Sequence, residues 1–205
     1  MKQQILVIPG GWAHDDEQGY LDYLSSKQVH INQDPSWMLK NWRAQLVWHL
    51  GDGYEVTVPV MPSKDNAKYE QWKLWFERYF EHIDGDVILI GESLGGTFLV
   101  KYLSENNVPF NITSLILVAA GFDDGNGYSF GDFVIDKELS KTVSDKIERL
   151  GLFYSDNDPY SLLAEVDKMS QLSDNCHTEV LHNRGHFSVA VIPELVTYVR
   201  ELCEK

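Results

Sequence analysis

The sequence predicts an α/β protein built on a mainly parallel sheet with helices on both faces. Short apolar runs rich in β-branched residues alternate along the chain with longer segments whose apolar residues recur at helical spacing. The expected strands are apolar throughout, which is typical of parallel strands that are buried on both faces. Several reactive residues directly follow these strands, and parallel sheets bind ligands at that edge.

Each element can be placed by its residue range. Strands are expected over residues 5–8, 55–60, 86–90, 112–120, 150–155 and 177–182. Helices are expected over residues 35–50, 68–83, 97–105, 160–172 and 187–204, with a polar helix near 136–149. The stretch before Asp34 is polar and is expected to be irregular. Asp34 is placed to cap the first helix, Pro35 suits its first turn, and Pro193 is expected to interrupt the last helix.

The length suits one domain, so we expect residues 1–205 to form a single domain. Between Asp123 and Arg149 the alternation of strands and helices breaks down. We expect residues 123–149 to be a cap-like insertion in that domain. Its aromatic residues are expected either to pack in the interior or to line a substrate pocket; they are Tyr128, Phe130 and Phe133.

Charge and composition exclude several classes of function. The formal net charge is −14, so the chain repels nucleic-acid phosphates, and we expect no nucleic-acid partner. No apolar run approaches the roughly 18 residues that cross a bilayer, and no signal-peptide pattern is present, so we expect no membrane insertion. Two cysteines are too few for a disulfide framework, which favours a cytoplasmic location. The remaining expectation is a small-molecule substrate.

The segment from Gly91 to Gly95 reads Gly-Glu-Ser-Leu-Gly and matches the nucleophile-elbow pattern. It lies between an expected strand and an expected helix, where the pattern has structural meaning. The turn at Ser93 is sharp enough to require small residues two positions before and after it, and Gly91 and Gly95 meet that need. Ser93 is therefore the expected nucleophile.

A serine nucleophile needs a histidine base that is oriented by a carboxylate. His186 follows the last expected strand and precedes the last expected helix, and no other histidine is placed as well. Asp158 follows the strand over 150–155 and precedes Pro159, so it is the expected carboxylate, and Asp156 is expected to be a turn or cap residue. A metal site around His186 is a weaker interpretation, because Cys, Asp or Glu ligands at matched spacing are missing.

Backbone N–H groups are expected to bind the oxyanion that forms during attack. Leu94, at the start of the helix after Ser93, supplies one such group. Gly11 in the loop after the first strand is favoured as the second, with Trp12 close behind. No glycine pattern of a nucleotide site occurs, so neither a cofactor nor a metal is expected.

These motifs together resemble those of the small serine hydrolases grouped with retinoblastoma-binding protein 9. The resemblance covers nearly the whole chain and is carried by the elbow, the Ser-x-x-Asp-Pro turn at 155–159 and the Gly-His-Phe segment at 185–187. It implies a compact α/β-hydrolase that lacks the first two strands of larger members, with a triad at Ser93, Asp158 and His186. Segments 19–33 and 123–149 look longer than a minimal member needs.

The predicted reaction is hydrolysis of a small ester, thioester or amide through an acyl-enzyme, as in a carboxylesterase. Ser93 attacks, His186 moves the proton and Asp158 orients His186. Two alternatives stay open. One is a catalytically silent, hydrolase-like module that binds a ligand, and the other is an acyltransferase, because a fold does not by itself fix a reaction.

Overall fold

The computed structural model of the chain describes residues 2–29, 41–123, 128–161 and 163–204. In this part of the chain six strands form one sheet: β1 (Gln3–Ile8), β2 (Tyr54–Thr57), β3 (Asp86–Glu92), β4 (Asn111–Val118), β5 (Leu150–Ser155) and β6 (Cys176–Leu181). The strand order is β2-β1-β3-β4-β5-β6, and every neighbouring pair is parallel. This confirms the predicted fold class.

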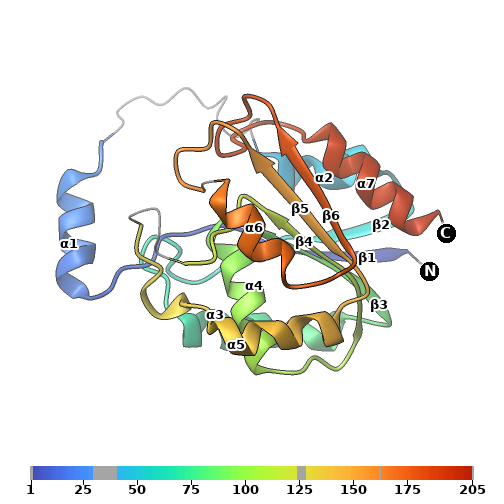
Figure 1. Ribbon diagram of the computed structural model, residues 1–205, viewed down its shortest axis with the longest axis horizontal. Helices are drawn as coiled ribbons and strands as arrows, with labels where there is room; N and C mark the ends of the chain where they lie inside the picture. Colours follow the sequence, from blue (N-terminus) through green and yellow to red (C-terminus); the bar gives the residue numbers. More distant parts are fainter. Residues whose placement is uncertain (1, 30–40, 124–127, 162, 205) are drawn as a thin grey trace.

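Helices cover both faces of the sheet (Figure 1). The α-helices are α1 (Glu17–Ser26), α2 (Trp42–Leu50), α3 (Tyr69–Glu77), α4 (Leu94–Glu105), α5 (Lys137–Ser140), α6 (Ala164–Ser170) and α7 (Pro193–Cys203). Short 3-10 helices are η2 (Phe80–His82), η4 (Gly131–Phe133) and η5 (Lys141–Lys146). Helices α2 and α7 pack on one face, and α3, α4 and α6 pack on the other. Within the described residues, no helix is both long and apolar enough to span a bilayer.

Two apolar cores result from the period-two alternation of side chains along each strand. On β3, Ile88 and Ile90 point towards α2 and α7, whereas Val87 and Leu89 point towards α3 and α4. From its second residue, every residue of β3 is buried. The strand that leads to the elbow is therefore fixed from both sides.

Three helix predictions need correction. Helix α1 was expected to be irregular; it is a helix capped by Asp16, whose side chain accepts the Gly19 N–H at 2.8 Å. A continuous helix over 35–50 is wrong, because Asn41 is non-helical and caps α2; Asp34 and Pro35 lie outside the described residues. The last helix does not contain Pro193 as an interruption but begins at it, since proline suits a first turn.

Other elements differ mainly at their ends. The helix expected over 160–172 starts only at Ala164. The helix expected near 136–149 is divided into α5 and η5, which lie against α4. Phe133 from the same segment is completely buried in the core beside Trp72, and Phe130 belongs to the same core, so two of the three aromatic residues named there pack inside.

Candidate active site

Ser93 lies in a strained turn between β3 and α4. Its φ of 51° and ψ of −127° are values that residues other than glycine rarely adopt. The Ser93 N–H donates to the Val118 carbonyl at 2.8 Å, and the Gly96 N–H donates to the Ser93 carbonyl at 2.9 Å. Strain of this kind persists only where the surroundings hold it, and it is concentrated at functional sites.

Gly91 and Gly95 flank this turn at positions where no side chain fits. A Cβ atom on Gly91 would lie 2.5 Å from the Gly96 Cα atom, and one on Gly95 would lie 2.3 Å from the Ile8 carbonyl oxygen. Both distances are far below van der Waals contact, and in each case the obstacle is backbone. The packing of the turn therefore requires both glycines, for the reason that the elbow pattern predicts.

His186 and Asp158 form a hydrogen-bonded pair at the same edge of the sheet. His186 Nδ1 lies 2.8 Å from Asp158 Oδ2 and 3.0 Å from Oδ1. An ionised carboxylate only accepts hydrogen bonds, so Nδ1 is the donor, and in the neutral form of the ring Nε2 keeps its lone pair. The Asp158 side chain is fully buried, and its Oδ1 also accepts the N–H groups of Tyr160 and Ser161.

The neighbouring carboxylate, Asp156, is directed elsewhere. Its Oδ1 accepts the Asn183 N–H at 2.8 Å, and its Oδ2 bonds the ring of His182. The hydrogen bond from Asn183 lowers the pKa of Asp156, and His182 acts in the same direction. Asp156 therefore joins two loops, and Asp158 is the carboxylate that meets His186.

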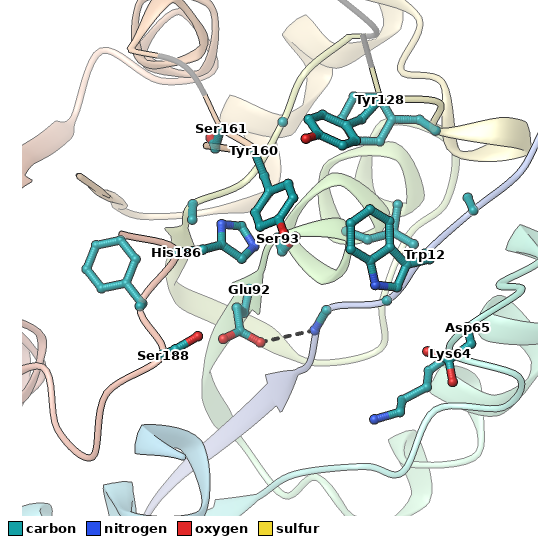
Figure 2. A pocket seen from close by; sticks show the side chains of 18 of the residues that line it. Trp12, Lys64, Asp65, Glu92, Ser93, Tyr128, Tyr160, Ser161, His186 and Ser188 are labelled. Carbon is teal, nitrogen blue, oxygen red and sulfur yellow. Dashed lines mark hydrogen bonds between the residues drawn. The ribbon is translucent and has the colours of Figure 1, made fainter. Parts of the chain in front are cut away.

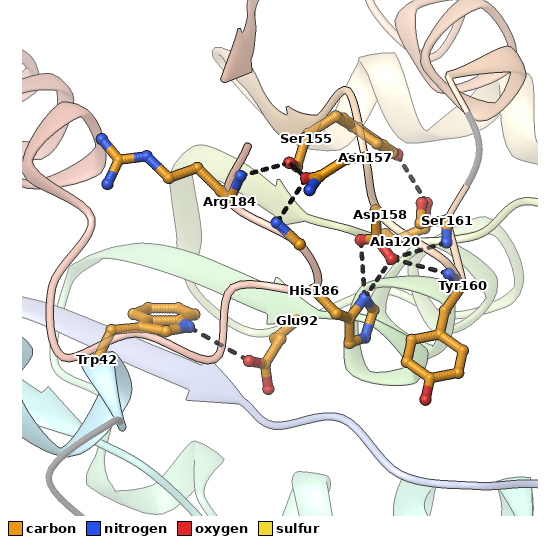
Figure 3. A network of polar contacts seen from close by, with 12 residues as sticks. Trp42, Glu92, Ala120, Ser155, Asn157, Asp158, Tyr160, Ser161, Arg184 and His186 are labelled. Carbon is orange, nitrogen blue, oxygen red and sulfur yellow. Dashed lines mark hydrogen bonds and ion pairs between the residues drawn. The ribbon is translucent and has the colours of Figure 1, made fainter. Parts of the chain in front are cut away.

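Two further residues hold the loop that carries His186. Asn157 was not singled out from the sequence, and Ser155 was named only as the start of the Ser-x-x-Asp-Pro turn. Asn157 Oδ1 accepts the Gly185 N–H at 2.8 Å, and Ser155 Oγ accepts the Arg184 N–H at 2.9 Å (Figure 3). Four consecutive polar residues, 155–158, thus bind the backbone or ring of the loop after β6. Such a dense polar run between an apolar strand and a proline was the available signal.

The loop after β1 lies against the elbow. The Gly10 N–H donates to Glu92 Oε2 at 3.2 Å, and the Trp12 N–H donates to the Lys64 carbonyl at 2.7 Å. The Trp12 N–H is therefore already used within the fold. No partner for the Gly11 N–H is found among the described residues. Leu94, the first residue of α4, has an N–H without a partner inside the helix.

A cavity of about 270 Å³ brings these groups together. Its lining includes Ser93, His186, Gly11, Leu94, Trp12 and Tyr160. Figure 2 shows the imidazole of His186 beside Ser93 in this cavity. Three separate parts of the chain thus contribute a hydroxyl, a base and backbone N–H groups to one space.

Aromatic rings form one wall of the cavity. The ring of Trp12 lies 5.5 Å from that of Tyr160 and 6.1 Å from that of Tyr128, and Tyr160 also meets His186 edge-on at 5.0 Å. Phe130 lines the cavity as well. Helix α1 reaches this wall through Tyr23, whose ring is 5.8 Å from Trp12.

Sequence comparison places the chain beside known hydrolases. A family model described as serine hydrolase matches residues 27–191, more than half of the chain. A search of curated proteins gave no match.

Solved structures give the same architecture. The ydeN gene product from B. subtilis matches with a TM-score of 0.75 at 16% identity, over 100% of both chains. The meta-cleavage product hydrolase CumD from Pseudomonas fluorescens gives a TM-score of 0.64 at 12% identity, over 98% of this chain and 90% of that one. An esterase from Exiguobacterium antarcticum gives 0.55 at 16%, over 97% and 92%. At such identities the likeness shows the fold, a compact α/β-hydrolase.

Proposed function

The chain belongs to the serine hydrolase family, and on this basis we propose that it cleaves a small ester, thioester or amide through an acyl-enzyme. Ser93 is the proposed nucleophile, His186 the base and Asp158 the group that orients the base. The observation that carries the proposal is that a serine in a strained strand-to-helix turn shares a cavity with a histidine bonded to a buried carboxylate.

The reaction proceeds in two halves. The Ser93 oxygen attacks the substrate carbonyl while His186 Nε2 takes the hydroxyl proton, and the charge that develops on the imidazole is stabilised by Asp158. His186 then gives the proton to the leaving alcohol, thiol or amine, which departs. Water attacks the acyl-enzyme in the same way, with its proton passing through His186 back to the Ser93 oxygen.

The oxyanion of each tetrahedral intermediate lies between two backbone donors in this proposal. The Leu94 N–H, at the positive end of α4, is the first, and the Gly11 N–H is the second. The lack of a described partner for Gly11, beside the occupied N–H groups of Gly10 and Trp12, supports this choice.

The apolar part of the substrate packs on the aromatic wall. The space next to Ser93 is surrounded by Trp12, Tyr128, Phe130 and Tyr160, and a cavity of about 270 Å³ suits a short acyl chain or a single ring.

We also propose that residues 123–149, which supply Tyr128 and Phe130, shape the mouth of the pocket. The proposed substrate is a small molecule, and the proposed location of the chain is the cytoplasm. The Ser-x-x-Asp-Pro turn at 155–159 supports the proposal that the chain is related to the serine hydrolases grouped with retinoblastoma-binding protein 9.

A fluorophosphonate probe tests the mechanism, because it phosphonylates only an activated serine. We expect a mass increase on Ser93 in the wild-type protein and none in Ser93→Ala. His186→Ala should slow labelling by about 10²- to 10⁴-fold, the usual contribution of a general base. His82→Ala, which changes an exposed histidine distant from the cavity, is the matched control and should label normally. A folded wild-type protein that takes no label would overturn the proposal.

A further inference from the structure

Glu92 is a buried acid directly before the proposed nucleophile. Only 6% of the residue is exposed, and it lines the same cavity as Ser93. Its Oε1 accepts the Trp42 Nε1–H at 3.2 Å, as Figure 3 shows, and its Oε2 accepts the Gly10 N–H at 3.2 Å. Oε2 also pairs with the Arg43 guanidinium. Donors from α2 and from the loop after β1 thus converge on one carboxylate.

Stability alone does not explain this arrangement. Replacing a buried ion pair by apolar side chains of similar size is often neutral or stabilising, because the pair loses its hydration. A carboxylate close to a forming oxyanion also opposes the reaction through like-charge repulsion, unless another charge cancels it. Arg43 supplies that charge. An acidic side chain at this position therefore needs a neutralising partner. This indicates that Glu92 has a role that an apolar residue could not perform.

The hydrogen bond from the Gly10 N–H to Glu92 indicates what this role is, and Figure 2 marks it with a dashed line. A Cβ atom on Gly10 would lie 3.0 Å from the Ser93 Cβ atom, so the loop runs directly over the nucleophile. Two adjacent glycines have wide conformational freedom, and they need external contacts to hold one shape. Glu92 holds the loop at Gly10, and the Lys64 carbonyl holds it at Trp12. Gly11 lies between the two anchors.

We propose that Glu92 is a positioning residue that holds the Gly10–Gly11 backbone so that the Gly11 N–H points at the oxyanion. This inference rests on the proposed hydrolase function and deepens it. The hydrogen bond from Gly11 is made to the tetrahedral intermediate and not to the bound substrate, so misplacing the loop lowers kcat and leaves KM nearly unchanged.

A pair of double variants isolates the contact. Glu92→Met with Arg43→Met removes both charges and keeps the volume, so it should fold. Glu92→Gln with Arg43→Met keeps a single amide oxygen, which can accept the Gly10 N–H. The Trp42 Nε1–H then loses its acceptor in both forms, so the two forms differ at Gly10. Because losing one oxyanion donor costs about 10²- to 10³-fold in kcat, we expect the Met form to be about 10- to 100-fold slower than the Gln form, with equal KM.

Binding of a transition-state analogue gives an independent reading. A trifluoromethyl ketone adds the serine oxygen to form a tetrahedral oxyanion, so its Ki should rise in the Met form by the same factor by which kcat falls. Glu77→Met against Glu77→Gln is the matched control. Glu77 accepts the Tyr102 hydroxyl at 3.0 Å between α3 and α4, and both its variants should keep wild-type kcat.

The outcomes separate the two proposals. Equal kcat in the folded Met and Gln forms overturns the positioning role while leaving the hydrolase function in place. A fall in kcat without a change in the Ki of the ketone also overturns it, because the loss would then lie outside the oxyanion. A wild-type protein that neither turns over esters nor takes the fluorophosphonate label overturns the hydrolase function itself, and the role of Glu92 with it.

Discussion

The turn around Ser93 is packed so closely that single atoms decide whether it forms. Its backbone crosses the carboxyl ends of β1 and β4, and the neighbouring chain fills the space that side chains would need. The serine hydroxyl is thereby held out into the cavity, while its main chain is enclosed. The turn is therefore sensitive to substitutions that leave the hydroxyl itself unchanged.

Gly95→Ala should destabilise the protein by at least about 3 kcal/mol, at or above the usual cost of overpacking. The reason is that the new Cβ atom would lie 2.3 Å from the Ile8 carbonyl oxygen. Gly53→Ala is the matched control, because a Cβ atom there meets nothing within 4 Å. It should change the free energy of unfolding by less than about 0.5 kcal/mol. Urea denaturation of both variants measures the difference, and equal stabilities would contradict the prediction.

At the residue scale, the sequence could predict a site residue when the position of that residue depends only on the strand that precedes it. Ser93, Asp158 and His186 each come directly after a strand or its short turn, so a parallel sheet brings them to one edge. Glu92 and Asn157 were not singled out from the sequence, because their partners lie in distant parts of the chain: Glu92 meets Gly10 and side chains of α2, and Asn157 meets Gly185. No pattern within a single segment announces such contacts; only the folded arrangement of Gly10 and Gly185 reveals them.

Among the secondary-structure elements, apolar strands were the most predictable, since burial on both faces leaves a continuous apolar run. Helix α1 has no buried residue, and its apolar positions are few and lie next to Gly19, so the stretch was taken as irregular; Asp16 at the cap was a signal that it begins a helix. Helix α7 was predicted as a helix, but it begins later than expected, at Pro193. The prediction treated this proline as an interruption, whereas it lies in the first turn of the helix.

Burial also predicts how unequally the helices contribute to stability. Phe76→Ala in α3 should cost about 3–5 kcal/mol, since the ring is fully buried against Phe98 and Tyr102. Leu24→Ala in α1 should cost less than about 0.5 kcal/mol, because that side chain is 46% exposed. Thermal unfolding of the two variants compares them directly. A large loss from Leu24→Ala would mean that α1 is part of the cooperative core.

Considered as a whole, the molecule holds several tyrosines in its interior, and this makes it sensitive to high pH. Tyr154 is fully buried, and its hydroxyl donates to the Ala120 carbonyl at 2.7 Å. Burial raises the pKa of Tyr154 well above 10.0, and burial also raises the pKa of Tyr54 to about 12. In the unfolded chain tyrosine titrates near pH 10.

The free energy of unfolding should therefore be fully retained below about pH 10 and should fall as the pH rises towards 12 and beyond. The sign follows because the unfolded chain releases its tyrosine protons first. Urea unfolding at several pH values, with absorbance at 295 nm to follow tyrosinate, measures this. Tyr154→Phe should start about 1 kcal/mol less stable, and the difference from wild type should shrink at high pH. A constant difference across this range would show that Tyr154 does not contribute.

The strand order places the proposed base after a strand that is held less firmly than the strand before the proposed nucleophile. Ser93 follows β3, which has a neighbour on each side, whereas His186 follows β6, which ends the sheet, pairs only with β5 and contains no fully buried residue. Edge segments of this kind open locally at a lower free energy than the centre of a sheet. Detachment of β6 alone would displace His186 and stop catalysis. Activity should therefore be lost on mild heating before the molecule as a whole unfolds.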